Sequence, residues 1–242
     1  MSRAAYLLEA EGPVPYLEAW DLQRSLAGAV SRGELPDTVV LLEHAPVITL
    51  GRRTEEGELH VPEGAEVEIV ETDRGGKSTY HGPGQLVCYP IFDLTRHGQD
   101  VKKYCRDLEE ALIVTLASCG VGATRIGGLT GIWLEHPPRK IASIGIHISK
   151  WISTHGYALN VDIDPAPFTD WITACGLEDA QFTTIAREVG RPVSVGEVRP
   201  HALAALAEVF GLDFDELPEA AVDDLHAQPL HDRPAQRAAV FK

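Results

Sequence analysis

Apolar residues recur at intervals of three and four along residues 100–120, and this spacing predicts an amphipathic helix. The stripe consists of Val101, Tyr104, Cys105, Leu108, Ala111, Leu112, Leu116 and Cys119. A similar spacing between Pro15 and Arg32, closed by Gly33 and Pro36, predicts a first helix.

Short apolar or alternating runs, separated by glycine and proline, predict strands. They lie at residues 39–42, 47–50, 67–70, 85–91, 131–134, 141–149 and 157–163, and short helices follow as far as Phe210. Segregated helices with many short strands indicate an α+β fold, with helices packed on a mixed sheet. With no internal repeat, residues 1–212 are expected to form one domain. The acidic stretch 213–242 loses any sustained period from about Pro218, and we expect it to be a poorly ordered tail.

Length and charge limit the fold and the classes of partner. A chain of 242 residues that is 44% hydrophobic can bury one sizeable core. Its net charge of −15 argues against nucleic acid or an anionic membrane as the main partner. The acidic excess lies outside residues 74–212, so that segment could present a locally basic opening to an acidic carrier. With no long apolar run, we expect a cytoplasmic protein.

One of the four cysteines is a candidate for chemistry. All four are widely spaced without a CxxC pair, so we expect free thiols and neither a disulfide framework nor a zinc site. Cys105 and Cys119 lie on the apolar stripe and Cys88 lies in an apolar run, so packing explains them. Cys175 precedes Gly176 at the end of an apolar stretch. A thiol at such a bend is accessible, and the glycine lets a backbone N–H approach a developing oxyanion.

Lys140 is the candidate partner for that thiol, whose unperturbed pKa is about 8.5 and which needs a nearby cation to ionise at neutral pH. In residues 140–148, Lys140 shares its parity with Ile144, Ile146 and Ile148. A strand that is regular back to its start would turn the lysine toward the apolar side. The alternative is that Lys140 lies just before the strand and extends its side chain into water, and the pattern is equally consistent with it.

Residues 73–85 hold the densest cluster of glycines and polar residues in the chain. Gly76, Lys77 and Ser78 suggest a phosphate loop, but Glu71 stands where that motif needs its first glycine. A glycine-rich turn before His81 suits a pocket walled by bare backbone, and residues 155–160 repeat the pattern beside His155. The alternative is that both histidines hold turns through hydrogen bonds to carbonyl oxygens.

Taken together, these segments resemble the lipoyl(octanoyl) transferase family. The resemblance rests on residues 74–85, 140–145 and 155–160 and on Cys175 with Gly176, and residues 43–46 and 49–52 are similar to an early motif of the family. It covers roughly Ala4 to Phe210. Within it, Lys77 and Ser78 lie at a variable part of their motif.

The resemblance implies the α+β catalytic domain of biotin protein ligases and lipoate ligases, with no cofactor or metal. It makes Cys175 the nucleophile that carries the acyl group and Lys140 the group that lowers its pKa. The implied donor is octanoyl-acyl carrier protein, and the implied acceptors are lipoyl domains of 2-oxoacid dehydrogenase complexes and the glycine cleavage H protein. The implied walls of the acyl pocket are Arg74, Gly75, Gly76, Lys77, Ser78, Thr79, Tyr80, His81, Ser143, Ile144, Gly145, Gly156, Tyr157 and Ala158.

Two alternatives remain open at the level of sequence. One is an ATP-dependent lipoate or biotin protein ligase on the same fold, which would activate a free acid as an adenylate. The other is a catalytically silent module that binds the carrier. A requirement for ATP distinguishes the first, and binding without turnover distinguishes the second.

Overall fold

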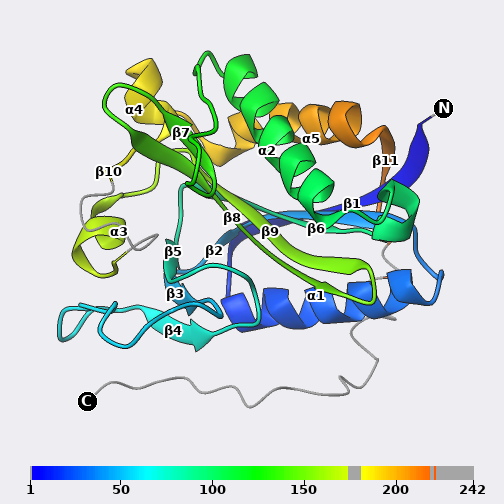
Figure 1. The fold of residues 1–242 in the computed structure, drawn as a ribbon, viewed down its shortest axis with the longest axis horizontal. Coiled ribbons are helices and arrows are strands. Elements are labelled where there is room, and N and C mark those ends of the chain that lie inside the picture. Colours follow the sequence, from blue (N-terminus) through cyan, green and yellow to red (C-terminus); the bar gives the residue numbers. More distant parts are fainter. Residues whose placement is uncertain (1, 174–180, 219–220, 222–242) are drawn as a thin grey trace.

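The computed structural model describes residues 2–173, 181–218 and 221. Its main feature is an eight-stranded mixed sheet in the order β10-β8-β9-β6-β2-β1-β11, with β7 paired to β8 outside this path (Figure 1). The strands are β1 (Arg3–Val14), β2 (Asp37–His44), β6 (Gln85–Ile91), β7 (Ile132–Leu134), β8 (Arg139–Ser149), β9 (Ile152–Asn160), β10 (Gln181–Phe182) and β11 (Leu212–Glu216).

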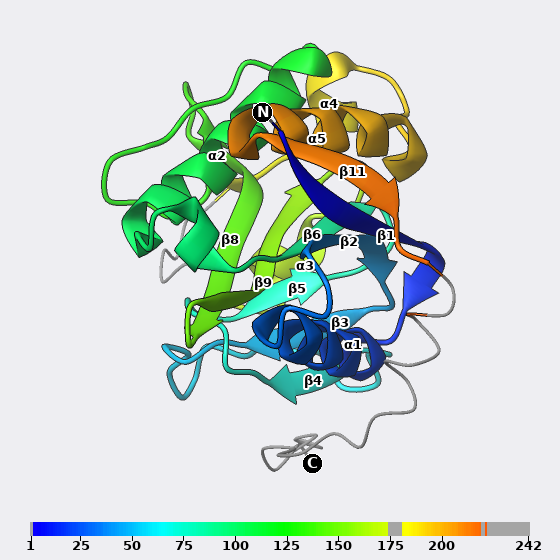
Figure 2. The ribbon, with the colours of Figure 1, turned by 90° about the vertical axis from the view of Figure 1, so that its right-hand side faces the viewer.

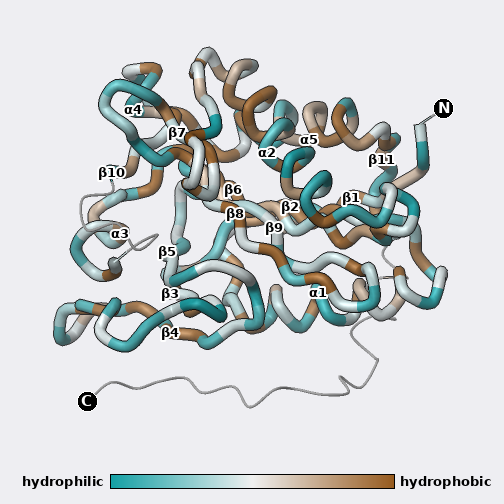
Figure 3. The backbone as a smooth tube through the Cα atoms, in the orientation of Figure 1, coloured by the Kyte–Doolittle hydropathy of each residue, from teal (hydrophilic) through white to brown (hydrophobic). Residues whose placement is uncertain are grey.

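Helices cover both faces of this sheet. Helices α2 (Val101–Ser118) and α5 (Val195–Phe210) pack side by side over one face, and α1 (Tyr16–Ser31) lies against the other (Figures 1 and 2). Two apolar clusters fill these interfaces, the larger under α2 and α5 and the smaller over α1. Much of the central sheet is hydrophobic, whereas the peripheral turns are largely hydrophilic (Figure 3).

Local sequence explains where these helices begin and end. The Asp100 side chain accepts hydrogen bonds from the Lys102 and Lys103 N–H groups and starts α2. Ser194 and Glu197 form a reciprocal capping box at the start of α5, and Gly211 ends that helix with a left-handed backbone, φ 64°.

A second, three-stranded sheet adjoins the main one, in the order β4-β3-β5. Its strands are β3 (Val47–Leu50), β4 (Glu68–Glu71) and β5 (Thr79–His81). Short elements complete the chain: the 3₁₀ turn η1 (Leu94–His97), α3 (Ala166–Asp170) and α4 (Ile185–Val189). Tyr80 of β5 packs against Phe168 of α3, which stacks on Phe182 of β10, so aromatic contacts join the small sheet to the edge of the large one.

The predicted α+β class is confirmed, as are the two predicted amphipathic helices and most of the predicted strands. Only short helices were predicted before Phe210, but α5 is 16 residues long. Strand β9 begins at Ile152, earlier than predicted, because the β8–β9 hairpin pairs Ser149 with Ile152. Strands β1, β5, β10 and β11 were not predicted. Strand β11 includes Asp213 to Glu216, where the sequence predicted the start of a poorly ordered tail. These residues instead form a parallel edge ladder with β1, since Leu212 is buried and anchors the strand beside it. The rest of the predicted tail falls almost wholly outside the described residues. No helix in the described ranges has the length and apolar character needed to cross a bilayer.

Candidate active site

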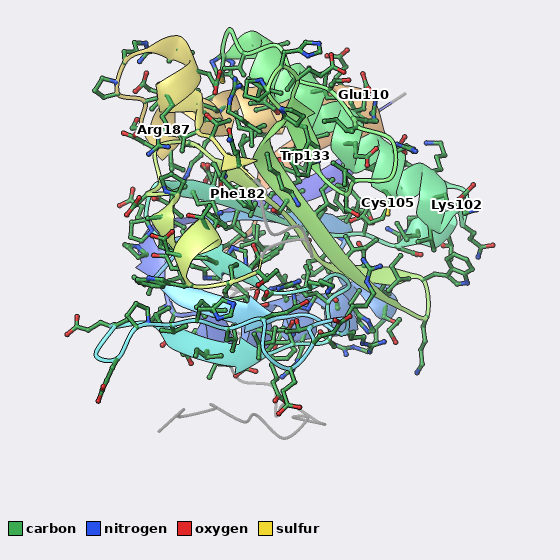
Figure 4. All side chains as sticks on the ribbon, turned by 60° about the vertical axis from the view of Figure 1, so that its left-hand side comes forward. Lys102, Cys105, Glu110, Trp133, Phe182 and Arg187 are labelled. Carbon is green, nitrogen blue, oxygen red and sulfur yellow. The ribbon has the colours of Figure 1, made fainter. Side chains whose placement is uncertain are left out.

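A cavity of about 810 Å³ lies along β8. Strands β7 and β10 pair only with the first residues of β8, and the rest of β8 pairs with β9 alone. This volume falls within the usual range for small-molecule sites. Cys105, Trp133 and Phe182 line it from α2, β7 and β10, respectively (Figure 4). The cavity is therefore assembled from segments far apart in the sequence.

Most of the predicted pocket residues surround this cavity. Two predicted segments meet because β8 and β9 are antiparallel: Ser143 pairs with Ala158, Ile144 with Tyr157 and Gly145 with Gly156. The predicted residues that line the cavity are Arg74, Gly75, Gly76, Lys77, Ser78, Thr79, His81, Lys140, Ser143, Ile144, Gly145, Gly156, Tyr157 and Ala158.

Tyr80 lies elsewhere. It is the middle residue of β5, so its side chain points away from the face that carries Thr79 and His81. Its ring contacts Phe168 and Trp171 at centroid distances of 5.6 and 5.9 Å. In this structure Tyr80 therefore supports the wall from behind and does not line the cavity.

Bare backbone forms part of the wall, as the glycine pattern predicted. The Gly75 N–H donates to the Ile146 carbonyl oxygen at 2.9 Å, and a Cβ added at Gly145 would lie 3.0 Å from the Gly75 oxygen. At Gly156 an added Cβ would lie 2.1 Å from the Cys88 oxygen, so only glycine lets β6 and β9 approach this closely.

Arg74 holds the glycine-rich turn in place. Its guanidinium donates to the Thr49 carbonyl oxygen at 2.6 Å, to the Gly75 oxygen at 3.0 Å and to the Lys77 oxygen at 2.8 Å. Buried carbonyl oxygens need donors, and the planar guanidinium supplies several in fixed directions. Arg74 thus shapes the cavity by bonding to the protein's own backbone.

The next two residues of the turn differ in environment. Lys77 forms ion pairs with Glu58 and, at 3.4 Å, with Glu55. The Ser78 hydroxyl oxygen is buried and makes no hydrogen bond to any described residue. Because a buried hydroxyl without a partner is costly, Ser78 is suited to bind a polar group of a substrate.

Lys140 is buried in this cavity, with 3% of its surface exposed. It lies between Trp133 of β7 and Phe182 of β10, its partners in the two adjoining ladders. A Cβ on Gly131 would lie 2.8 Å from Lys140 Cε, so the lysine side chain packs against the backbone of that glycine. The regular-strand interpretation of Lys140 is confirmed and the solvent-exposed alternative is wrong, because β7 and β10 enclose the residue.

The candidate nucleophile Cys175, with Gly176, lies outside the described residues. The other three cysteines are free thiols, as predicted. Burial raises the pKa of Cys88 to about 12, and burial also raises the pKa values of Cys105 and Cys119. Cys105 nevertheless lines the cavity, which its place on the apolar stripe of α2 did not predict.

Three buried histidines stand beside the cavity among aromatic rings. His44 Nδ1 donates to the Val14 carbonyl oxygen at 3.0 Å, and the Tyr89 hydroxyl lies 2.6 Å from its Nε2. His81 Nδ1 lies 2.7 Å from the Gln85 side-chain oxygen, and His155 Nε2 lies 2.7 Å from an Asp73 carboxylate oxygen. These ring contacts are thus to side chains and not to backbone carbonyl oxygens. The His81–Gln85 bond does span the turn at residues 82–84, whereas His155 bonds to a carboxylate distant in sequence.

Burial lowers the pKa of each of these rings. For His44 it lowers the pKa to about 4; for His81 and His155 desolvation is likewise the largest cause, and in His155 the Asp73 carboxylate opposes it. All three rings are neutral at pH 7, which suits a pocket for an uncharged acyl chain. Within the described ranges, no three His, Cys or carboxylate side chains are grouped to hold a metal ion.

Sequence reasoning missed several lining residues. Tyr16, Val87, Tyr89 and Trp133 come from ordinary apolar stretches of helices and strands, where no local signal marks them. Arg52 was within reach of prediction, because it closes the early motif at residues 49–52.

Solved structures share this fold. Lipoate-protein ligase A bound with ATP superposes with a TM-score of 0.71, at 18% identity, over 93% of each chain. A chain from the structural analysis of an archaeal lipoylation system, a bipartite lipoate protein ligase and its E2 lipoyl domain from Thermoplasma acidophilum, superposes with a TM-score of 0.69. The two chains are 17% identical, and the match covers 93% of this chain and 91% of that one. The fold class is thus the α+β catalytic domain of lipoate ligases.

Sequence comparison identifies the family. The family model for the lipoyl protein ligase A/B catalytic domain matches residues 15–207. An octanoyltransferase of Chloroflexus aurantiacus is 45% identical over 84% of this chain and 92% of its own length. One from Mycobacterium tuberculosis is 50% identical over 81% of this chain and 83% of its own length. The chain belongs to the lipoyl protein ligase A/B catalytic domain family.

Proposed function

We propose that this protein is an octanoyltransferase that moves an octanoyl group from octanoyl-acyl carrier protein, through a thioester on Cys175, to a lysine of a lipoyl domain. The observation that carries the proposal is the burial of Lys140 in a cavity walled by glycine backbone. The named activity of relatives at 44–50% identity supports it.

The first half-reaction forms the enzyme thioester. The Cys175 thiolate attacks the carbonyl carbon of the carrier thioester, and the bond from that carbon to the carrier sulfur breaks. The departing sulfur takes a proton from the Lys140 ammonium, which leaves Lys140 as a neutral amine.

The second half-reaction restores the enzyme. The amine of the acceptor lysine attacks the Cys175 thioester, the carbon–nitrogen bond forms and Cys175 leaves as a thiolate. The neutral Lys140 takes the proton released by the amine and regains its charge. Backbone N–H groups at Gly145 or Gly176 would stabilise each oxyanion by about 3 kcal/mol per donor. Because a thioester is already activated, neither step needs ATP.

The acceptors we propose are lipoyl domains of 2-oxoacid dehydrogenase complexes and the glycine cleavage H protein. The Thermoplasma lipoate protein ligase with this fold is described with its E2 lipoyl domain as one lipoylation system, which supports a lipoyl domain as acceptor. The donor carrier and a cytoplasmic location remain predictions from the sequence.

Incubation with octanoyl-acyl carrier protein followed by intact mass measurement tests the proposal. We expect a stable octanoyl adduct that Cys175→Ala abolishes and that Cys105→Ala, a matched change at a thiol that lines the cavity, retains. An adduct that still forms on the Cys175→Ala variant would mean that another cysteine carries the octanoyl group and that the proposed nucleophile is wrong. Octanoylation of an apo-lipoyl domain only when ATP is added would favour a ligase, and carrier binding without any adduct would favour a silent binding module.

A further inference from the structure

A continuous chain of buried hydrogen bonds connects the pocket wall to the main chain of Lys140. His81 Nδ1 donates to Gln85 Oε1 at 2.7 Å, and Gln85 Nε2 donates to Asn160 Oδ1 at 2.9 Å. Asn160 Nδ2 then donates to the Thr183 carbonyl oxygen at 3.1 Å, and the Thr183 N–H donates to the Lys140 carbonyl oxygen at 3.0 Å. All five residues are buried, with at most 7% of their surface exposed.

The donor-to-acceptor direction of these hydrogen bonds is fixed at the Thr183 end of the series. The Thr183 carbonyl oxygen can only accept, so Asn160 must turn its NH₂ group toward it and its oxygen toward Gln85. Gln85 in turn presents its oxygen to His81. Gln85 and Asn160 are direct partners across the β6–β9 ladder, so the strand register itself brings the two amides together. Each buried amide thus has both a donor and an acceptor contact, and the network has one orientation.

A second set of contacts holds Thr183 from the other side. Its hydroxyl donates to Glu188 Oε1 at 2.5 Å, and Glu188 accepts hydrogen bonds from Arg139 at 3.2 and 3.1 Å. Arg139 and Lys140 are the two residues of β8 that pair with β10. Thr183 is therefore clamped against the segment that carries the lysine, although β10 itself has only two residues.

We infer that Asn160 is a positioning residue for the transfer reaction: through Thr183 it fixes the main chain of Lys140 and so the place of the lysine side chain in the cavity. The inference rests on the proposed role of Lys140. Asn160 is not among the residues lining the cavity, so it acts through other residues. A displacement of about 1 Å in a reacting group costs on the order of 100-fold in rate, so loss of this support should be measurable.

Asn160→Ala tests the inference, because it leaves the Thr183 oxygen and the Gln85 amide without their partner. We expect kcat to fall by about 10- to 100-fold, with a KM for the octanoyl donor within about threefold of wild type. We also expect the midpoint for alkylation of Cys175, followed against pH by peptide mass spectrometry, to rise toward the ordinary thiol value of about 8.5.

Ser153→Ala is the matched control. Ser153 is a fully buried residue near the opposite end of β9, where its hydroxyl accepts from the Phe92 N–H at 3.0 Å and donates to the Pro90 oxygen at 2.8 Å. Its loss should lower the free energy of unfolding comparably and leave the Cys175 titration unchanged. If Asn160→Ala fails to fold, Glu188→Gln is the second variant. It weakens the contacts that Glu188, a partly exposed residue, makes with Thr183 and Arg139. The Cys175 titration should then shift in the same direction by a smaller amount.

A folded Asn160→Ala enzyme with wild-type kcat and a wild-type Cys175 titration would overturn the inference while leaving the proposed function intact. If both variants lose stability but keep the titration, the network is structural only and the inference is wrong. A wild-type enzyme that forms no octanoyl adduct and whose Cys175 titrates as an ordinary thiol would instead refute the proposed function, and this inference with it.

Discussion

The Nζ atom of Lys140 lies 5.4 Å from the centroid of the Trp133 ring, and the two residues are direct partners across β7 and β8. An ammonium over an indole face is stabilised by about 0.5–2 kcal/mol, more when water is excluded. Trp133 is itself buried, and its indole N–H donates to the Thr130 oxygen at 3.3 Å. The ring is thus fixed independently of the lysine and gives the ammonium a defined position.

Gly131→Ala should disable the enzyme by displacing Lys140. The new Cβ would lie 2.3 Å from the Ala142 oxygen and 2.8 Å from Lys140 Cε, at a backbone φ of +96° that L side chains rarely adopt. We expect a loss of about 1–3 kcal/mol in the free energy of unfolding from strain, and at least about a 10-fold loss of octanoyl transfer. Urea denaturation and a transfer assay measure the two effects.

Gly120→Ala provides the matched comparison, because Gly120 has a similar φ of +80° with nothing within 4 Å of the added Cβ. It should lose stability through the backbone alone and keep its activity. Equal activity losses in the two variants would contradict a specific effect on Lys140.

Arg74→Lys should loosen the glycine-rich turn. A lysine cannot reach the oxygens of Thr49, Gly75 and Lys77 together, so at least one buried carbonyl loses a donor. We expect the free energy of unfolding to fall by about 2–3 kcal/mol and the KM for the octanoyl donor to rise. An exposed arginine changed in the same way, Arg53→Lys, should leave the urea midpoint unchanged. Wild-type stability of Arg74→Lys would show that the turn does not depend on the guanidinium.

Stability should decrease as the pH falls from about 6.5 to about 4. Burial lowers the folded-state pKa of His44 from 6.5 to about 4, so in this window the unfolded chain binds the proton that the folded ring excludes. His44 alone should cost roughly 3 kcal/mol across the window, and His81 and His155 add to the same trend. Urea denaturation at half-unit pH steps measures the slope.

His44→Gln should make that slope shallower, because the amide can still donate to Val14 and accept from Tyr89 but does not titrate. His201→Gln removes an exposed histidine of α5 and should leave the slope as it is. If His44→Gln left the pH dependence of the unfolding free energy unchanged, burial would not keep the His44 ring from taking up a proton.

Alkylation at pH 7 should discriminate among the thiols. Burial raises the pKa of Cys88 to about 12 and also raises the pKa values of Cys105 and Cys119, so these three stay protonated and react slowly. A short pulse of iodoacetamide should therefore label Cys175 first, and peptide mass spectrometry reads out the order. Faster labelling of Cys105, which lines the cavity, would point to Cys105 as the nucleophile.

The sequence by itself determined two of the long helices and most of the strands, and it indicated which segments surround the cavity. The apolar stripe of α2, the alternation along β8 and the glycines at residues 75, 76, 145 and 156 are local signals, since each reflects the backbone geometry or burial of its own segment. They were sufficient to predict the fold class and to indicate a pocket beside residues 73–85 and 155–160, whereas the individual residues of the wall came from the resemblance to a known family.

Only the tertiary structure decided the position of Lys140 and its surroundings. Its parity was compatible with burial or exposure. Pairing with β7, the strand just before β8, and with β10, about 40 residues further along the chain, settled that it is buried. The chain of contacts from His81 to Thr183 likewise depends on the register of β6 against β9. A register is a relation between two segments, so the pattern within either segment does not contain it.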